Sequence, residues 1–367
     1  MTGVEADFLQ DGAQSADDVA DRLVAFIGRA TATIDVAIYD FDAREGATAR
    51  IADALEAAMA RRVRLRVAFN QGRDAEATHN PPMVCDPEAI EGLEVPTRGV
   101  HDQGALMHHK YVVRDAADVW TGSTNWTDDA FSREENVIVR VSSPEVALAY
   151  TRNFEQLWAK GRLESSGGEG SNATLGRGVE VRPVFSPRGP SLAHLAAECI
   201  ASADHRVRIL SPVITSGAVL GTLAELAGRA SFDLVGAYDA TQMREVVGQW
   251  HAWPPNHWKI AAWDAIRPRL SGKVTTPWSA AGGVHDFMHA KVVVADGEVL
   301  TGSYNLSHGG EENAENVLHI HSGALAERFG SFVERVAERY AAPNDAASGT
   351  STDPSSRRGP TPPRPGA

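Results

Sequence analysis

Helix-spaced and alternating apolar residues follow one another along the first part of the chain and predict alternating helices and strands. Ser15 and Asp18 have the spacing of a helix-capping box, and Pro144 stands where a first helical residue is expected. Because helices and strands alternate, the pattern predicts an α/β layered fold. The predicted helices cover residues 16–29, 47–62 and 143–160, and the predicted strands cover 33–38 and 63–69.

A second feature of the pattern is that it repeats. The stretch "MHHKYVVRDAADVWTGSTNWT", which begins at Met107, returns as "MHAKVVVADGEVLTGSYNLS" from Met288. The apolar run after Phe26 has a weaker counterpart after Cys199, and both parts end in a helical pattern. Because a diverged repeat of this length is typical of two similar folding units, we expect two α/β halves in one chain.

Composition sets the boundaries of the two halves. Residues 161–178 are rich in Gly and Ser and are predicted to be a linker, so the first half covers 1–160 and the second covers 179–342. The last stretch, 343–367, has almost nothing to bury and is predicted to be a disordered tail. A length of 367 residues agrees with two halves, since single cores rarely grow beyond about 300 residues.

The net charge and the cysteine content argue against several classes of protein and kinds of site. The formal net charge of -13 argues against a protein that coats nucleic acid or clings to an anionic membrane, although a local basic pocket stays open. Cys85 and Cys199 have no metal-ligand spacing, so we expect neither a disulfide framework nor a thiolate zinc site. The absence of a signal peptide pattern and of a long apolar stretch predicts a soluble cytoplasmic protein.

The repeated stretch carries chemically capable side chains. Because side chains alternate between the faces of a strand, His108 and Lys110 share one face while His109 points the other way. The same alternation places Asp115 on the face opposite His108. Since the repeat has Ala290 in place of His109, we expect chemistry from His108 and a packing or rim position for His109.

Each half thus presents a histidine, a lysine, a hydroxyl and an amide, a combination that binds anions and includes a nucleophile or proton carrier. Two such sets suit a phosphodiester. One neutral imidazole attacks phosphorus, the other donates a proton to the leaving oxygen, and the lysines neutralise the remaining oxygens, with no metal or cofactor. The predicted catalytic residues are His108, Lys110, His289 and Lys291, and the predicted phosphate-binding residues are Ser123, Asn125, Ser303 and Asn305.

An acidic residue is needed to orient each histidine, since the bond made at one ring nitrogen sets the state of the other. Glu135 and Glu315 stand at equivalent places after the two Ser/Asn pairs, and we expect them to supply it. The two histidines have such similar sequence settings that neither is favoured as the nucleophile.

The pattern His-x-Lys-x4-Asp followed by Gly-Ser-x-Asn, present twice, resembles the phospholipase D superfamily, and the resemblance extends to about Ala342. It implies two similar α/β halves, each a mixed sheet flanked by helices, related by a pseudo-two-fold axis with one active site at their interface. It also implies a phosphohistidine intermediate that water or an alcohol resolves. Finally, it implies that Asp115 and Asp296 are largely structural and that Glu135 and Glu315 orient the histidines.

The superfamily does not fix the substrate. We expect a phosphoric diester hydrolase of phospholipase D type, which hydrolyses or transfers the phosphatidyl group of a phospholipid. The alternative is a nuclease that cleaves DNA or RNA. A third class, a catalytically inactive protein that binds phosphoesters, is disfavoured because both motifs are intact. One chain contains both half-sites, so activity requires no oligomer.

Two further regions bear on the substrate. Residues 248–278 contain five of the eight tryptophans, mixed with lysines and arginines. Such a mixture can stack on bases or lie at a lipid headgroup boundary, and it can equally form a packed cap on the second half. His101–Asp102 and His285–Asp286 precede the two motifs and indicate either a pocket rim or a solvated turn.

Overall fold

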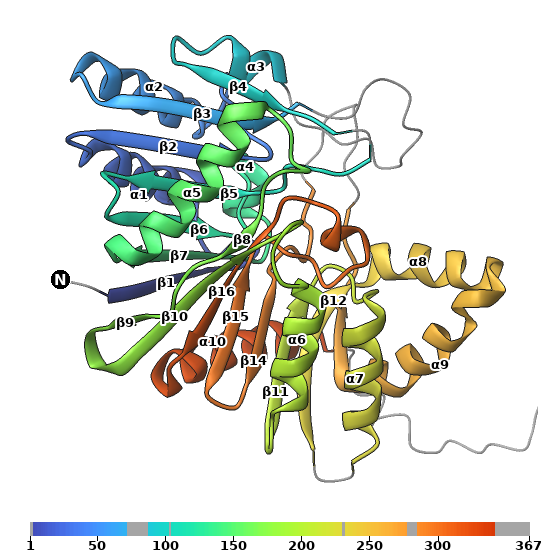
Figure 1. Ribbon diagram of the computed structural model, residues 1–367. Helices are drawn as coiled ribbons and strands as arrows, with labels where there is room; N and C mark the ends of the chain where they lie inside the picture. Colours follow the sequence, from blue (N-terminus) through green and yellow to red (C-terminus); the bar gives the residue numbers. More distant parts are fainter. Residues whose placement is uncertain (1–2, 72–86, 103, 230–231, 277–284, 342–367) are drawn as a thin grey trace, which may run out of the picture.

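Two α/β halves make up the computed structural model, which describes residues 3–71, 87–102, 104–229, 232–276 and 285–341 (Figure 1). The first half contains strands β1 Gly3–Leu9, β2 Thr33–Ile38, β3 Arg64–Asn70, β4 Thr97–Val100, β5 Lys110–Arg114, β6 Asp118–Gly122 and β7 Asn136–Ser142. Its helices are α1 Ala16–Gly28, α2 Ala49–Ala60, α3 Pro87–Glu91, α4 Asp128–Ser132 and α5 Pro144–Lys160.

The second half begins with two short strands and then follows the same order. Its strands are β8 Gly168–Glu169, β9 Ala173–Leu175, β10 Val179–Phe185, β11 Arg206–Ser211, β12 Asp233–Asp239, β13 Leu270–Lys273, β14 Val292–Ala295, β15 Glu298–Gly302 and β16 Asn316–His321. Its α-helices are α6 Leu192–Ala201, α7 Gly217–Ala227, α8 Ala240–Ala252, α9 His257–Ile266 and α10 Gly323–Arg339, with short 3-10 turns η1 Gly176–Gly178, η2 Pro254–Asn256, η3 Arg267–Arg269 and η4 Gly309–Glu311.

The two sheets have the same strand order. The first is β4-β3-β2-β5-β6-β7-β1, and the second is β13-β12-β11-β14-β15-β16-β10, continued by β8. In both sheets the three strands at one edge are parallel, and the other neighbours along this path are antiparallel. This shared topology confirms the predicted pair of mixed α/β halves.

Local signals in the sequence account for the helix boundaries. The hydroxyl of Ser15 accepts from the backbone N–H of Asp18, whose carboxylate accepts in return from the backbone of Ser15, so α1 starts with the predicted capping box. Ser143 caps α5 before Pro144, and Gly161 ends that helix in the left-handed conformation at φ 63°. The predicted elements of the first half therefore form within a few residues of their expected bounds.

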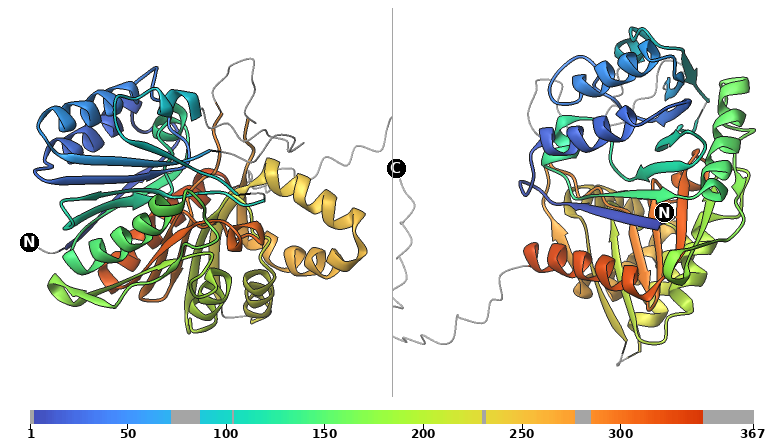
Figure 2. Two further views of the ribbon diagram at one scale, coloured as in Figure 1. Left: turned by 45° about the horizontal axis from the view of Figure 1, so that its top comes forward. Right: turned by 90° about the vertical axis from the view of Figure 1, so that its left-hand side faces the viewer.

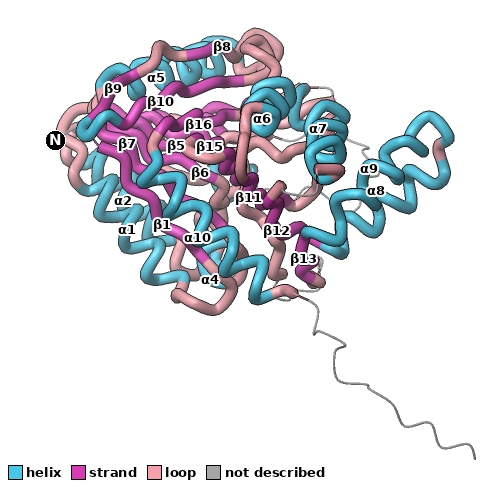
Figure 3. The backbone as a smooth tube through the Cα atoms, turned by 90° about the horizontal axis from the view of Figure 1, so that it is seen from below, coloured by secondary structure: helices cyan, strands magenta, loops and turns pink. Residues whose placement is uncertain are grey.

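Alternating faces of the strands build three hydrophobic clusters. One lies under α1 and α2 in the first half, and another lies under α6 and α7 in the second. The third is shared by both halves and includes the inner faces of α5 and α10, with Tyr150 and Phe329 among its buried rings. In Figure 3 the strands of both sheets run through the middle of the molecule with helices around them. The shared cluster fixes the halves against each other.

The predicted linker, residues 161–178, belongs to the folded body rather than forming a free connection. Within it β8 and β9 both pair with β10, and the side chains of Ala173 and Leu175 are buried in the shared cluster. The Gly and Ser content predicted a linker, but pairing with β10 gives backbone partners to residues 168–169 and 173–175. The predicted tail 343–367 and Cys85 lie outside the described residues.

One connection between parallel strands of the second half contains a pair of additional helices. In the second half the chain passes from β12 to β13 through α8, η2, α9 and η3, and Figures 1 and 2 show α8 and α9 projecting from the body. This insertion contains most of the tryptophan-rich segment, except Trp278, which lies outside the described residues. None of the helices in the described part of the chain combines the length and apolar character needed to cross a bilayer.

Glycines end the central strands β6 and β15. Gly122 has φ +144° and Gly302 has φ +157°, conformations that side chains rarely adopt. A Cβ on Gly122 would lie 2.0 Å from the carbonyl oxygen of Val137, and one on Gly302 would lie 2.1 Å from that of Asn316. Both glycines therefore allow the next residue, a predicted site serine, to lie against the neighbouring strand.

Gly302→Ala should lower the free energy of unfolding by about 3 kcal/mol, because the added methyl meets backbone that cannot move aside. Gly221→Ala in the interior of α7 is the matched control, since open space surrounds that position and alanine favours a helix. Urea unfolding followed by circular dichroism measures both. Equal midpoints for the two variants would contradict this account of Gly302.

Candidate active site

Each motif histidine is held by the opposite half. His108 lies just before β5 and donates its backbone N–H to the carbonyl of Ala314 (2.9 Å). His289 lies just before β14 and donates in the same way to Glu135 (3.1 Å). One residue earlier, each motif also forms a β-bridge to the other half. The two motifs therefore meet at the interface between the halves.

The adjacent histidines of the first motif point to different surroundings. The ammonium of Lys110 donates to the carbonyl of His108 (2.7 Å), and the ring of Tyr39 contacts both of these side chains. His109 is fully buried on the other side, where its ring lies beside Tyr111. Strand alternation correctly predicted this separation, and His109 is a core residue rather than a rim residue.

A carboxylate orients the first histidine. Nδ1 of His108 lies 2.9 Å from Oε2 of Glu315, which comes from the second half. The hydroxyl of Ser303 donates to the same oxygen (2.5 Å). All three side chains are buried, so the carboxylate favours a proton on Nδ1 and leaves Nε2 with a free lone pair.

The second histidine has a neutral amide as its nearest partner. Nδ1 of His289 lies 3.1 Å from Oδ1 of Asn136, and the hydroxyl of Ser123 donates to the same oxygen (2.7 Å). The chain histidine–partner–serine is thus repeated in both halves. It ends in an acid at His108 and in an amide at His289.

The expected role of Glu135 is therefore wrong. The backbone N–H of Ser123 donates to Val137, whereas that of Ser303 donates to Asn316, so the structural equivalent of Glu315 is Asn136. The loop of the first half is one residue longer than the sequence match assumed. The matching "EEN" and "AEN" triplets concealed this shift.

Glu135 instead belongs to a buried ion pair at the edge of the site. Its carboxylate accepts from the ammonium of Lys273 (2.8 Å) and from the hydroxyl of Tyr340 (2.5 Å). Lys273 ends β13 and Tyr340 follows α10, so both partners come from the second half. Glu135 ties the halves together and does not touch either histidine through its side chain in these contacts.

The motif aspartates have a structural role. Asp115 (φ 51°) accepts backbone N–H bonds from residues 31–33, and Asp296 (φ 47°) accepts them from residues 204–206. Although burial raises it, these bonds hold the pKa of each carboxyl below its usual value. Each aspartate fixes the turn before the strand that neighbours its motif, as the resemblance implied.

The predicted phosphate-binding residues divide into two kinds. The hydroxyls of Ser123 and Ser303 are fully buried and donate to the histidine partners, so they position those partners. Asn125 and Asn305 are partly exposed, and in both of them the buried Oδ1 has no hydrogen-bond partner within the described part of the chain. These two amides have unused capacity to bind substrate.

Burial dominates the electrostatics of the site. It lowers the pKa of His108 to about 4, against the raising effect of Glu315. It also lowers the pKa of Lys110 to about 7 and holds those of His289 and Lys291 well below their usual values. Both lysine charges act on both histidines, so the four side chains lie close together. A bound anion would restore their positive charge.

Glu134, Asp129 and Asp40 were not predicted from the sequence, whereas His285 was expected at either a pocket rim or a solvated turn. Glu134 lies 3.5 Å from Nδ1 of His289 and 3.3 Å from Nδ1 of His285, whose Nε2 lies 3.5 Å from Asp129. These carboxylates outweigh burial and raise the pKa of His285. Burial raises the pKa of Asp40 to about 7, against the lowering charge of Lys110. Of the two alternatives given for His285, the rim agrees with these contacts, since Glu134 lies between His285 and the catalytic candidate His289.

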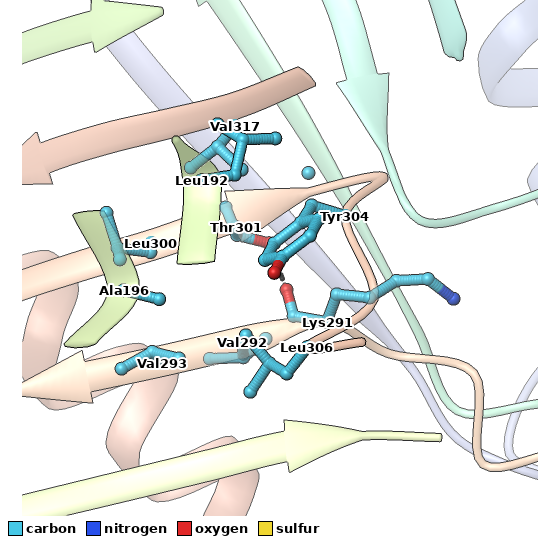
Figure 4. A pocket seen from close by; sticks show the side chains of 11 residues that line it. Leu192, Ala196, Lys291, Val292, Val293, Leu300, Thr301, Tyr304, Leu306 and Val317 are labelled. Carbon is cyan, nitrogen blue, oxygen red and sulfur yellow. Dashed lines mark hydrogen bonds between the residues drawn. The ribbon is translucent and has the colours of Figure 1, made fainter. Parts of the chain in front are cut away.

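A small apolar pocket lies behind Lys291 and is distinct from the site (Figure 4). Its volume is about 20 Å³, which is room for a single water. Figure 4 shows the amine of Lys291 pointing away from it, while the hydroxyl of Thr301 donates to the carbonyl of Lys291 (3.0 Å). The other lining residues are Leu192, Ala196, Val292, Val293, Leu300, Gly302, Tyr304, Leu306 and Val317.

A second cluster of titratable side chains lies at the start of β15, the end farther from Gly302. It consists of Cys199, Glu298 and His319. Nε2 of His319 lies 2.7 Å from Glu298 and its Nδ1 lies 3.3 Å from a guanidinium nitrogen of Arg182. Burial and the adjacent carboxylate raise the pKa of the Cys199 thiol well above its usual value. Because both ring nitrogens are engaged within the protein, we assign this group a structural role.

The two halves match one family model in succession. The model, described as "Cardiolipin synthase, PLD-like domain", matches residues 23–158 and again residues 196–336. Each match contains one of the two motifs and the partner residue that the other motif uses.

Curated relatives match a smaller part of the chain. The mitochondrial cardiolipin hydrolase of Xenopus tropicalis is 30% identical over 144 residues, which is 39% of this chain and 62% of that protein. The mitochondrial cardiolipin hydrolase of Xenopus laevis is 45% identical over 60 residues, 16% of this chain and 28% of that protein. The chain therefore spans less than two thirds of the length of these relatives.

A solved structure matches nearly the whole fold. The crystal structure of phosphatidylserine synthase from Haemophilus influenzae Rd KW20 superimposes with a TM-score of 0.61 over 91% of this chain and 86% of that one, at 15% identity. At that identity the likeness concerns the fold. Together with the family match over both halves, it shows that this chain belongs to the phospholipase D superfamily, in the family of cardiolipin synthase PLD-like domains.

Proposed function

We propose that this protein is a phospholipase D-type phosphodiesterase that hydrolyses or transfers the phosphatidyl group of a phospholipid. The observation that carries this proposal is the meeting of two oriented histidines and two buried lysines at one interface. A phosphodiester needs one nucleophile, one proton donor and cations for its oxygens, and this set supplies all three. The cardiolipin-related names of the relatives and of the family support a lipid as substrate.

The different partners of the two histidines suggest their roles. Attack on phosphorus leaves positive charge on the ring of the nucleophile, and the carboxylate of Glu315 stabilises that charge on His108. The nearest partner of His289 is the neutral amide of Asn136 at 3.1 Å, and the carboxylate of Glu134 is farther away at 3.5 Å. The protonated ring of His289 is therefore stabilised less than that of His108 and gives up a proton more readily. We therefore propose His108 as nucleophile and His289 as general acid.

The reaction then runs in two balanced steps. Nε2 of His108 forms a bond to phosphorus while the bond to the leaving oxygen breaks, and protonated His289 donates its proton to that oxygen. Neutral His289 next accepts a proton from water or an alcohol, whose oxygen bonds to phosphorus as the N–P bond breaks. The charge of the bound anion favours the protonated form of Lys110 and Lys291, and their ammonium groups then neutralise the non-bridging oxygens in both steps.

Bis(p-nitrophenyl) phosphate separates the two roles, because p-nitrophenol leaves without a general acid. His289→Ala should release about one p-nitrophenol per chain and then stall, since no base activates water for the second step. His108→Ala should give no such burst. Steady-state turnover should fall by about 10³-fold in both variants. A burst in His108→Ala alone would reverse the assignment.

Glu315→Gln should reduce steady-state turnover by about 10²-fold or more while the protein stays folded, because the amide no longer stabilises charge on His108. Glu135→Gln is the matched control. It should mainly lower the midpoint of urea unfolding, because the buried ammonium of Lys273 then keeps only the more distant carboxylate of Asp11, at 3.5 Å, as a charge partner. Stopped-flow and unfolding measurements on both variants test this, and a larger catalytic loss in Glu135→Gln would contradict the structural alignment.

The substrate class is tested with phosphatidylcholine vesicles, cardiolipin vesicles, and single- and double-stranded DNA. We expect release of a phosphatidyl product from lipid, in EDTA as well as in plain buffer, and none of it with His108→Ala. Thin-layer chromatography detects the lipid product, and gel electrophoresis detects DNA cleavage. Cleavage of DNA without any lipid product would overturn the lipid proposal and leave the phosphodiesterase chemistry standing.

A further inference from the structure

The insertion between β12 and β13 forms a helical hairpin, residues 240–269, whose tryptophans divide into two groups. Trp250 and Trp263 are each only 4% exposed and belong to the core cluster of the second half. The ring of Trp263 packs edge-on against Tyr238 at a centroid distance of 4.8 Å. These two rings anchor the hairpin to the body, so the cap-like packing considered from the sequence applies to them.

The tip of the hairpin presents the other two tryptophans to solvent. Trp253 is 60% exposed and Trp258 is 50% exposed, and nearly every residue between 251 and 258 is exposed as well. The ammonium of Lys259 donates to the carbonyl of Thr215 (3.0 Å) and lies over the ring of Trp258. The bond from Lys259 ties the tip to the loop before α7. One edge of the Trp258 ring lies against Gly217 at the start of that helix, while half of its surface and more than half of Trp253 stay open to solvent.

The charge of the tip differs from that of the whole chain. From residue 246 to residue 263 Lys259 is the only Lys, Arg, Asp or Glu, whereas the chain has a formal net charge of -13. No carboxylate in this stretch would repel phosphate headgroups. Tryptophan combines a large apolar ring with an N–H donor, which is why it gathers at the boundary between headgroups and acyl chains.

The base of the hairpin adjoins the active site. Lys273, which ends β13, bonds to Glu135, the residue whose backbone holds His289. Val274, the next residue, is 72% exposed, the largest exposed fraction among the large apolar side chains at the described surface. Figures 1 and 2 show α8 and α9 projecting from the body, so their tip can enter a planar surface before the rest of the chain meets it.

From these observations we propose that Trp253 and Trp258 insert into the headgroup region of a phospholipid bilayer and dock the protein on it. This inference rests on the proposed function in one respect, since a bilayer is the surface on which a phospholipid substrate is found. Docking by inserted rings depends on buried apolar area rather than on charge. Binding should therefore vary little with salt and should not require anionic lipid, in agreement with the acidic chain.

The test measures vesicle binding separately from catalysis. The full chain carrying His108→Ala, which should not consume lipid, is sedimented with sucrose-loaded phosphatidylcholine vesicles, with and without Trp253→Ala/Trp258→Ala. We expect the double substitution to weaken partitioning by about tenfold or more. Leu148→Ala on α5, where the side chain is 48% exposed, is the matched control and should not change partitioning.

In the otherwise unchanged protein, Trp253→Ala/Trp258→Ala should leave turnover of bis(p-nitrophenyl) phosphate intact, which also shows that the variant folds. Unchanged vesicle binding by this variant would overturn the docking proposal. The proposal would also be overturned if the double substitution converted an oligomer into a monomer in size-exclusion chromatography without loss of vesicle binding. The tip would then join copies of the chain. Tip-dependent binding without any lipid product would instead overturn the proposed function and leave docking in place.

Discussion

The contact between His108 and Glu315 is the interaction on which the rest of the site depends. It joins a histidine of the first half to a carboxylate of the second, with both groups buried. A carboxylate without a partner would be costly to bury there, so this contact requires the halves to stay docked. The shared hydrophobic cluster and the backbone bonds beside each histidine supply that docking. The packing that docks the two halves is therefore also what brings the catalytic groups together.

The two halves share one framework, but the two motif histidines have different hydrogen-bond partners. The two sheets share strand order, glycine-ended strands and histidine–partner–serine chains. One extra residue in the loop before β7 puts an amide where the other half has an acid. A change of one residue therefore alters the chemistry of a histidine without altering the fold around it.

Much of the architecture was predictable from the sequence, because it depends on local signals and on a long repeat. The capping box at Ser15, the proline at the start of α5 and the separation of His108 from His109 all follow from residue spacing. The partner of His289 was not predictable, since it depends on loop length between strands that pair only in three dimensions. For the same reason the ordered state of 161–178 was missed, because its partner strand comes later in the chain.

Placing both motifs in one polypeptide has a consequence for how such a site can evolve. In a symmetric dimer of a single-motif chain, every substitution appears twice, so both histidines must keep identical partners. Here Glu315 and Asn136 are encoded separately, so each position can be selected for its own task. Encoding both halves in one chain thus allows the two ends of the reaction centre to differ, as the proposed roles of electron-pair donor and proton donor require.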